Sequence, residues 1–328
     1  MRIVFMGTPD FAVAPLRALI AAGFELAAVV TAPDRPAGRG RRVQAPPVKE
    51  AALEAGIPVF QPATLRTPEA EALLRSMQPE VIVVVAFGQI LRRNILDLPP
   101  LGCLNLHPSL LPYLRGAAPI PAAIREGLTE TGVTVMLMNE RMDAGPILAQ
   151  ARVPIFPDDT AATLGDRLSR LGAELLVETL PRWKAGVIVP REQDESAATY
   201  CRPLTKADGF VDWSWPADLI ARTCRAYTPW PGCLTYWGDR LVRLLRVRAD
   251  PSWNDGGPPG TVVTRESAPG QRTLGITTGQ GVLVVEALQL AGKKPLAADE
   301  FLRGQPGFVG SRLSRELPSQ GDAASAAL

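Results

Sequence analysis

The stretch VIVVVA at residues 81–86 is an almost unbroken run of β-branched side chains. Such a run is typical of a strand buried on both faces, as strands are in the parallel sheets of α/β proteins. On either side of this run, short apolar stretches alternate with segments of helical character up to about residue 186. We expect strands over 2–6, 26–31, 81–86, 102–106 and 131–138, and helices over 8–20, 47–55, 67–77 and 160–183. This alternation predicts a doubly wound parallel sheet of the α/β class.

The second half of the chain has a different pattern. One helix is expected over 216–226, and it is followed by short strands separated by turns. The strands are expected over 232–237, 240–247, 260–263, 273–277 and 281–289. Short strands at close spacing predict a small β-barrel, and the oligonucleotide-binding barrel is one such fold. We therefore expect a Rossmann-like domain over 1–189, a linker over 190–205, a barrel over 206–315 and a disordered tail over 316–328.

Composition and charge limit the class of protein. The chain has 328 residues, of which 46% are hydrophobic and 21% charged, and its formal net charge is +2. No stretch reaches the ~18–20 apolar residues of a membrane helix, and the N-terminus lacks the apolar run of a signal peptide. The four cysteines contain no CxxC pair, so we expect reduced thiols and no metal site. We therefore expect a cytoplasmic protein with no membrane contact and no evident protein partner.

The chain contains a single histidine, His107, in the stretch LNLHPSLLPYLRGAAPI at residues 104–120. Histidine is the side chain that most readily moves protons near neutral pH. Asn105 lies two residues earlier, so on a strand both side chains point to the same face. Asp143 follows in RMDAG, in a turn that contains glycine. A lone histidine is often only a hydrogen-bonded core or loop residue, but open α/β sheets bind ligands at such strand ends, which favours catalysis.

Two further segments bear on the choice of ligand. The stretch GTPDF at residues 7–11 follows the first expected strand, but Pro9 replaces the second glycine of GxGxxG, so a dinucleotide site is not favoured. The stretch TAPDRPAGRGRRVQAPPVK at residues 31–49 carries five basic residues and one acid, Asp34. Its prolines and glycines predict an irregular, exposed loop. Such a loop is equally well interpreted as solvated or as a site for a polyanion.

Taken together, these motifs resemble the folate-dependent formyltransferases. The resemblance extends to about Val309 and rests on TAPDRPAGRGRR, VVVAFGQIL, LGCLNLHPSLLPYLRGAAP, ETGVTVMLMNERMDAG, TPWPG and AGKK. The DRPAGRG and TPWP segments favour those members of the family whose acceptor is initiator methionyl-tRNA. The resemblance implies a Rossmann-like domain that binds the co-substrate 10-formyltetrahydrofolate and an oligonucleotide-binding-type barrel that helps to hold the tRNA.

The resemblance also implies roles for particular residues. The family's catalytic residues correspond to Asn105, His107 and Asp143. Its folate-contacting stretch corresponds to Ser109, Leu110, Leu111 and Pro112. Because the folate rings need an apolar slot, we expect Phe87, Gly88 and Ile90 to contact the folate as well. The family's loop for the tRNA acceptor stem corresponds to residues 34–44, with Arg35, Arg39, Arg41 and Arg42. In formyl transfer, Asn105 would donate to the formyl oxygen, while His107 and Asp143 would handle the proton.

The chain departs from the family pattern at a few positions, and other functions stay open. Phe87 stands where the family commonly has Tyr, Tyr113 and Leu114 where it has a basic residue and Trp, and Leu137 where it has Gln. These departures concern the pocket and not the reaction. One alternative is a formyltransferase for a small amine such as an amino sugar nucleotide, or a formyltetrahydrofolate hydrolase. Another is a non-catalytic RNA-binding protein.

Overall fold

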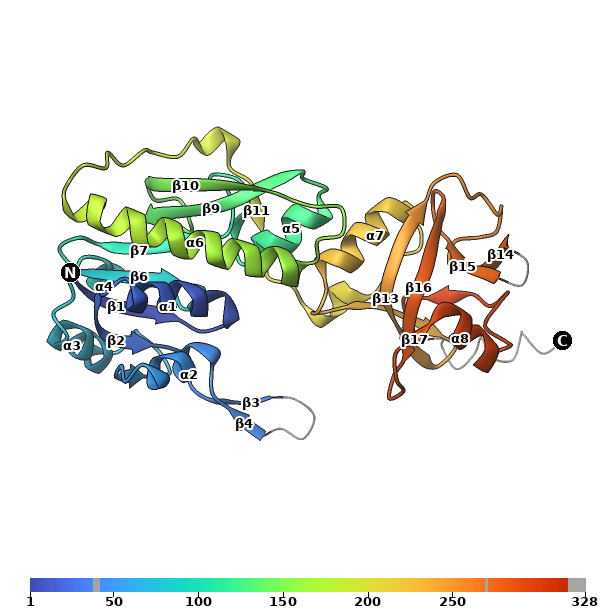
Figure 1. Cartoon of the computed structure of the whole chain (residues 1–328), viewed down its shortest axis with the longest axis horizontal. Helices are drawn as coiled ribbons and strands as arrows, with labels where there is room; N and C mark the ends of the chain where they lie inside the picture. Colours follow the sequence, from blue (N-terminus) through green and yellow to red (C-terminus); the bar gives the residue numbers. More distant parts are fainter. Residues whose placement is uncertain (38–41, 269–270, 318–328) are drawn as a thin grey trace. The chain divides into compact units, whose positions relative to one another are not determined.

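The run that begins at Val81 forms β6 (Val81–Val85), and all five of its residues are buried. β6 is the central strand of a seven-stranded sheet, which belongs to the first of two compact units (Figure 1). The computed structural model describes residues 1–37, 42–268 and 271–317. The first unit comprises Met1–Ile120, Thr129–Phe156 and Thr163–Arg202, and the rest of the described chain forms the second unit.

The sheet of the first unit is mostly parallel. Its order is β10-β9-β7-β6-β1-β2-β5. The other six strands are β1 (Arg2–Gly7), β2 (Glu25–Val30), β5 (Val59–Phe60), β7 (Cys103–His107), β9 (Glu130–Leu137) and β10 (Ile147–Pro154). β9 runs antiparallel to β7, and β10 runs antiparallel to β9. The sequence predicted a wholly parallel sheet without β10, but an antiparallel pair needs only a short connection, here the turn that carries Asp143.

Helices cover both faces of this sheet. Those of the first 202 residues are α1 (Val13–Ala21), α2 (Pro47–Glu54), α3 (Pro68–Ser76), α4 (Arg93–Leu96), α5 (Pro119–Arg125) and α6 (Ala161–Lys184), with the short turns η1 (Asp10–Ala12) and η2 (Glu195–Ala197). Buried residues of α3 and α4 pack with residues of β1, β2 and β6 in one core cluster. On the other face, α6 approaches β7 so closely that a Cβ at Gly172 would lie 2.7 Å from Leu106. No helix in the described parts of the chain is long and apolar enough to cross a membrane.

The second unit is built on an antiparallel sheet. Its strands are β12 (Cys233–Trp237), β13 (Arg240–Asp250), β14 (Val262–Ala268), β15 (Gln271–Thr277), β16 (Val282–Leu290), β17 (Leu296–Ala297) and β18 (Leu313–Ser314), and its helices are η3 (Lys206–Gly209), α7 (Ala217–Ala226) and α8 (Ala298–Gly304). The sheet runs β14-β15-β16-β13-β12-β18. Its two ends meet, because Val262 N–H donates to Ser311 O at 2.9 Å and Leu313 N–H donates to Gly260 O at 2.8 Å. The sheet therefore closes, as the predicted barrel requires.

Residues 190–202 differ from the predicted linker. The backbone of Arg191 exchanges two hydrogen bonds with Ile147, of 2.8 and 2.9 Å. Further along, β11 (Tyr200–Cys201) pairs with β8 (Arg115–Gly116). Both ends of this polar segment thus bind other strands and turns of the first unit through backbone hydrogen bonds. Most of the predicted tail, 318–328, lies outside the described residues.

The prediction of reduced thiols was wrong for one pair of cysteines. Cys224 of α7 and Cys233 of β12 form a disulfide, with 5.1 Å between their Cα atoms. The sequence shows a separation of nine residues and no recognised pairing motif. The chain turns back between α7 and β12, which brings the two thiols together, and this turn depends on the tertiary fold.

Glu80, just before β6, binds both the first strand and the end of α6. Its carboxylate accepts from Lys184 Nζ at 2.5 Å and from the backbone N–H of Arg2 at 2.7 Å. The hydrogen bond from Lys184, followed by that from Arg2, lowers the pKa of Glu80 from 4.5 to about 2. A carboxyl whose pKa is lower in the folded state stabilises the fold above its unfolded pKa, and this contribution is lost as the pH falls toward 2.

We therefore expect Glu80→Gln to lower the denaturation midpoint at neutral pH. The difference from wild type should shrink as the pH falls below about 4.5. Urea titrations of both proteins at several pH values measure this. Glu54→Gln, which removes a pair on the exposed surface with Arg17, is the control and should change the midpoint less. An offset of Glu80→Gln that is independent of pH would contradict this role for the charge.

Candidate active site

Asn105 and His107 lie on β7, whose carboxyl end is at His107. They are two residues apart on the strand, so their side chains project from the same face. Asn105 is partly buried, and His107 is only 4% exposed. β7 lies between β6 and β9, and in the register Asn105 is opposite Val84 and Met136. The two predicted catalytic residues are therefore held by a strand with neighbours on both sides.

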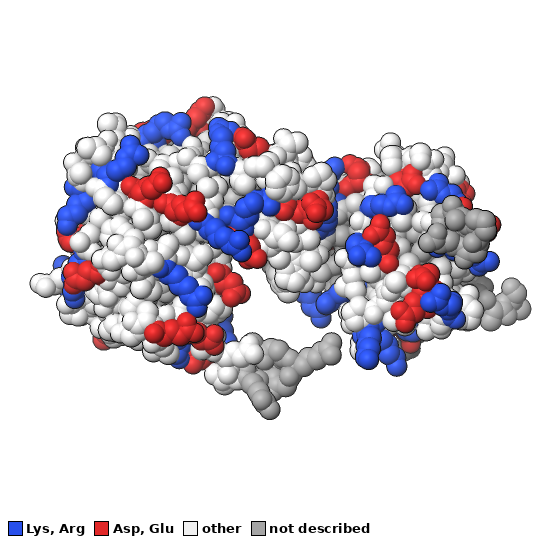
Figure 2. Space-filling view, viewed as in Figure 1, with Lys and Arg blue, Asp and Glu red and all other residues white. Residues whose placement is uncertain are grey.

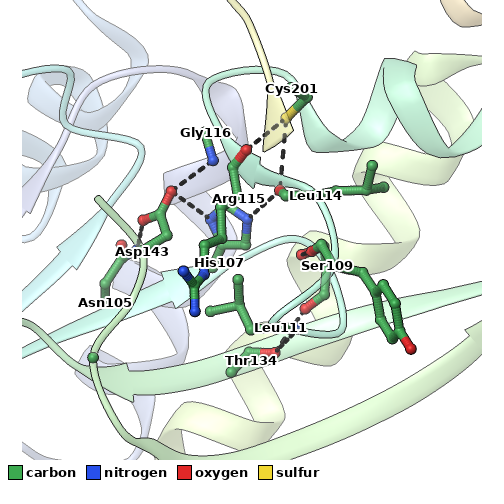
Figure 3. Close-up of polar contacts among 12 residues, drawn as sticks. Asn105, His107, Ser109, Leu111, Leu114, Arg115, Gly116, Thr134, Asp143 and Cys201 are labelled. Atoms are coloured by element: carbon green, nitrogen blue, oxygen red, sulfur yellow. Dashed lines mark hydrogen bonds and ion pairs between the residues drawn. The ribbon is translucent and has the colours of Figure 1, made fainter. Parts of the chain in front are cut away.

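One ring nitrogen of His107 is already hydrogen-bonded to the backbone. Its Nε2 lies 2.9 Å from the carbonyl oxygen of Leu114. Since a carbonyl can only accept, Nε2 carries a hydrogen and donates it. The other nitrogen, Nδ1, lies 3.7 Å from Oδ2 of Asp143 (Figure 3). The Leu114 carbonyl thus selects the tautomer and turns Nδ1 toward the carboxylate.

Asp143 joins the three residues into one cluster. Its Oδ2 accepts from the backbone N–H of Gly116 at 2.8 Å, and its Oδ1 accepts from Asn105 Nδ2 at 3.4 Å (Figure 3). The φ angle of Asp143 is 49°, in the left-handed region that residues other than glycine seldom adopt. Such a conformation costs energy and persists where several contacts determine it, which is common at functional sites.

Cys103, the cysteine on the same strand as Asn105 and His107, is not an activated nucleophile. Cys103 lies on β7 two residues before Asn105, and burial, together with nearby Asp97, raises the pKa of its thiol to about 12. The thiol is therefore protonated at neutral pH and cannot act as a thiolate. Among the described residues, no group of three or more His, Cys, Asp or Glu side chains could hold a metal ion.

The first group of predicted folate residues follows β6. Phe87 is buried in the core cluster beneath the sheet, and its carbonyl oxygen accepts from Thr8 Oγ1 at 3.4 Å. Gly88 has a φ of 82°, which glycine adopts without strain, and no atom would lie within 4 Å of an added Cβ. Ile90 is 68% exposed. An apolar side chain so exposed on a loop is available to cover a ligand.

The second group, Ser109 to Pro112, forms the turn between His107 and Leu114. Ser109 is buried and its hydroxyl donates to the carbonyl oxygen of Tyr113 at 2.5 Å. Leu111 packs with Met136 and Ile147, and its N–H donates to Thr134 Oγ1 at 3.2 Å. The buried members of this group therefore hold the turn in place, and the turn presents the Leu114 carbonyl to His107.

A cavity of about 630 Å³ lies in the first unit beside Gly102 and Cys103, at the amino end of β7. Its walls combine charged and apolar side chains, among them Arg93, Leu96, Asp97, Leu137, Met138 and Trp183. None of the predicted folate residues lines it. Leu96 and Met138, however, pack in the same core cluster as Phe87. Met138 also begins the loop that leads to Asp143.

The described part of the basic segment, on either side of residues 38–41, differs from the irregular loop that was predicted. It forms an antiparallel ribbon of β3 (Arg35–Ala37) and β4 (Arg42–Gln44), which hydrogen bonding between the strands stabilises where an irregular loop was expected. Arg35 is exposed, whereas Arg39 and Arg41 lie outside the described residues. The single acid, Asp34, is bound by Gln61 and Lys49, and these bonds lower its pKa. On the face drawn in Figure 2, basic and acidic side chains are interspersed, so no broad surface of one charge covers the first unit there.

The sequence did not reveal the groups that hold the three catalytic candidates. Two are backbone groups, the Leu114 carbonyl and the Gly116 N–H, which no residue type encodes. The third is Gln193, whose Nε2 donates to the carbonyl oxygen of Asp143 at 2.8 Å. Gln193 lies fifty residues from Asp143, in a segment whose composition predicts a linker, so no local pattern pointed to it.

Both units of the chain match models of a known protein family. Residues 1–180 match the family model described as formyl transferase, and residues 203–306 match its C-terminal domain. The chain therefore belongs to the formyl transferase family.

Within that family, the chain is similar to methionyl-tRNA formyltransferases over nearly its whole length. It is 48% identical to the enzyme of Roseiflexus castenholzii over 314 residues, which cover 95% of this chain and 99% of that protein. It is 50% identical to the enzyme of Chloroflexus aurantiacus over 304 residues, which cover 93% and 97%. HypX from Aquifex aeolicus, solved in complex with tetrahydrofolic acid, shares the fold with a TM-score of 0.62 at 17% identity. That match covers 94% of this chain and 48% of HypX, so the chain spans about half of the HypX length.

Proposed function

We propose that this protein transfers the formyl group of 10-formyltetrahydrofolate to the amino group of methionyl initiator tRNA. The observation that carries the proposal is the cluster of Asn105, His107 and Asp143 at the end of β7, in a chain that matches both domains of the formyl transferase family. The similarity to methionyl-tRNA formyltransferases along both units supports tRNA as the acceptor, in preference to a small amine.

The reaction forms a bond between the amine nitrogen of methionine and the formyl carbon, and breaks the bond between that carbon and N10 of the folate. One proton leaves the amine and one reaches N10. The folate supplies the activated formyl carbon. Negative charge develops on the formyl oxygen in a tetrahedral intermediate, and an oriented N–H donor stabilises it. In our proposal that donor is the amide of Asn105, which is neutral at any working pH.

His107 and Asp143 would move the proton. The Nε2 of His107 is bonded to the Leu114 carbonyl, so Nδ1 is the atom available for proton transfer. Asp143 would accept the proton of the amine, directly or through a water, and its charge would favour a cationic imidazole beside it. No covalent enzyme intermediate is needed, in keeping with the protonated thiol of Cys103.

For the folate, we propose contacts from Phe87, Gly88, Ile90 and the turn from Ser109 to Pro112. Phe87 lacks the hydroxyl that the family commonly places there, so any polar contact to the ring at that position must come from other groups.

For the tRNA, we propose that the ribbon of β3 and β4 enters the acceptor-stem region with Arg35, Arg39, Arg41 and Arg42. The barrel offers further cations, since Arg240, Arg243, Arg246 and Arg248 are all exposed along β13. Arg246 and Arg248 pair with Glu286, at 2.8 and 3.5 Å, which leaves the strand with more cations than anions. Arginine pairs well with phosphate and stacks on unpaired bases.

Formyl transfer to aminoacylated initiator tRNA tests the proposal directly. Purified protein is incubated with 10-formyltetrahydrofolate and methionyl initiator tRNA, and formylmethionyl-tRNA is measured. Elongator methionyl-tRNA and an amino sugar nucleotide serve as competing acceptors. Turnover on the sugar alone, or hydrolysis without transfer, would contradict the proposal. We place the enzyme in the cytoplasm with its acceptor, although a disulfide such as Cys224–Cys233 is unusual there.

The ribbon should matter for the tRNA and not for the folate. Replacing Arg39, Arg41 and Arg42 by alanine is expected to raise the KM for methionyl-tRNA and to flatten its dependence on salt, because each lost phosphate contact removes counterion release. The Kd of a folate analogue should stay within about twofold, since no ribbon residue is among the proposed folate contacts.

A matched variant separates the ribbon from net charge. Arg17, Arg66 and Arg75 lie elsewhere on the surface of the first unit, and their replacement by alanine removes the same charge. That control should leave the KM for tRNA nearly unchanged. If the ribbon variant keeps the wild-type KM and salt slope, the ribbon does not bind tRNA. A parallel loss of folate affinity would instead make it a scaffold for the folate site.

A further inference from the structure

The segment from Arg191 to Cys201, here called the strap, contacts both the turn that carries Asp143 and the strand β8. It is fixed at both ends, by the Arg191–Ile147 backbone pair and by the β11–β8 pairing. The fit at the second end is close, because a Cβ on Gly116 would lie 2.2 Å from the carbonyl oxygen of Cys201. Only glycine therefore allows β8 and β11 this approach. Gly116 is also the residue whose N–H binds Asp143.

Gln193 is the member of the strap that touches the Asp143 turn. It is 8% exposed, and its Nε2 donates to the carbonyl oxygens of Asp143 and Gly145, at 2.8 and 2.7 Å. Its Oε1 accepts from Arg115 Nε and Nη2, at 3.1 and 2.9 Å. The amide thus makes four hydrogen bonds, which fixes its orientation. A shift of Gln193 would leave two backbone carbonyls and one guanidinium without these bonds.

Arg115 anchors Gln193. Its side chain is completely buried, and its Nη atoms reach both carboxylate oxygens of Glu195, at 3.1 and 3.0 Å, and the hydroxyl of Tyr200, at 3.1 Å. The hydrogen bonds from Arg115 lower the pKa of Glu195, and those to Glu195 and Tyr200 raise the pKa of Arg115, so both members of the ion pair stay charged at neutral pH. A planar guanidinium with fixed partners is a rigid support.

The position of Arg115 in the chain connects this support to the catalytic groups. The residue before it, Leu114, gives its carbonyl to His107, and the residue after it, Gly116, gives its N–H to Asp143 (Figure 3). The Arg115 side chain reaches the backbone of the same Asp143 through Gln193. Asp143 is therefore held from both sides, by Gly116 at its carboxylate and by Gln193 at its carbonyl, in a left-handed conformation.

We propose that Gln193, anchored by Arg115, is a positioning residue that sets the distance of the Asp143 carboxylate from Asn105 and His107. It touches neither substrate nor the reacting atoms and acts only through Asp143. The proposal rests on the proposed function, since it uses formyl transfer as its readout. It assigns a part in turnover to a segment outside the β7 motif.

Two variants test this role. Gln193→Met has a similar shape and removes all four hydrogen bonds. Gln193→Glu keeps an acceptor for Arg115 and removes the donors to the Asp143 and Gly145 carbonyls. Misplacement of a catalytic group by about 1 Å costs up to ~100-fold in rate. We expect kcat to fall about 10- to 100-fold in both variants. The KM values for methionyl-tRNA and 10-formyltetrahydrofolate should stay within about twofold, because substrate contacts are not altered.

A double variant separates positioning from general loss of stability. If Gln193 acts only through Asp143, Asp143→Asn combined with Gln193→Met should turn over no more slowly than Asp143→Asn alone in single-turnover assays. A structural role would make the two losses multiply. Gln289→Met is the control, because Gln289 Nε2 also donates to a backbone carbonyl, that of Lys293 at 2.7 Å, but in the second unit. Its kcat should equal that of wild type.

The outcomes that overturn the proposal are distinct from failure of the proposed function. Wild-type kcat in either folded Gln193 variant, a rise in KM at unchanged kcat, or multiplicative losses in the double variant would each refute positioning. If Gln193→Met does not fold, Gln193→Glu decides, because it keeps Arg115 paired. Absence of transfer by the wild-type enzyme would instead refute the proposed function.

Discussion

Replacing His107 or Asn105 by alanine lowers kcat for formyl transfer by at least ~100-fold, which is the expected cost of losing one oriented donor at a developing oxyanion. Asn105 is the amide at the carboxyl end of β7 that can donate to the formyl oxygen while its carboxylate partner holds it. His107 is the imidazole whose Nδ1 faces that carboxylate. No other imidazole can replace that of His107, since it is the chain's single histidine.

Steady-state kinetics with both substrates, on variants shown to be folded by circular dichroism, measure this effect. Asn94→Ala is a chemically matched control for Asn105, because Asn94 Nδ2 also donates to a carboxylate, that of Glu71, but on the surface at α4. Its kcat should be unchanged. Turnover near wild type in folded His107→Ala or Asn105→Ala would remove that residue from the mechanism.

Asp143→Asn is expected to be nearly inactive, although it changes only one atom. An amide cannot accept a proton from the amine and carries no charge to favour a cationic imidazole. It also fits the site poorly. The carboxylate accepts from Gly116 N–H and Asn105 Nδ2, so the new NH₂ must face one of these donors and lose that bond. The loss should therefore exceed that of a single donor, at more than ~100-fold in kcat.

Comparing Asp143→Asn with Asp143→Glu distinguishes the effect of the charge on kcat from the effect of the carboxylate's position. Glutamate keeps the charge but moves the carboxylate, and it must adopt the same left-handed backbone. We expect both variants to fold, with kcat low in both and their KM values close to wild type. Rates measured across the pH range of wild-type activity complete the test. If Asp143→Asn turns over like wild type at every pH, the carboxylate is only structural.

Much of the fold followed from local patterns. The run at residues 81–86 predicted a strand buried on both faces, and β6 is that strand, because side chains apolar at every position must be covered on both sides. Thr67 before Pro68 predicted a helix start, and Thr67 does accept a hydrogen bond from Ala70 N–H. β10 was missed, because ILAQARVP mixes buried and exposed positions without strict alternation. The pairing of β10 with β9 comes from the tertiary fold.

Some features of the candidate site likewise follow from the sequence, and others depend on the tertiary structure. That Asn105 and His107 share a face follows from the period of a strand, which the sequence contains, and the single histidine draws attention to them. The sequence could not show that Leu114 selects the tautomer of His107, that Gly116 and Gln193 hold Asp143, or that Cys224 meets Cys233. These contacts join residues distant in the chain, and several use backbone atoms that every residue possesses. A strand or helix shows in the sequence as a periodic pattern of side-chain types. These contacts, in contrast, form only when the sheet, its turns and the strap have packed together.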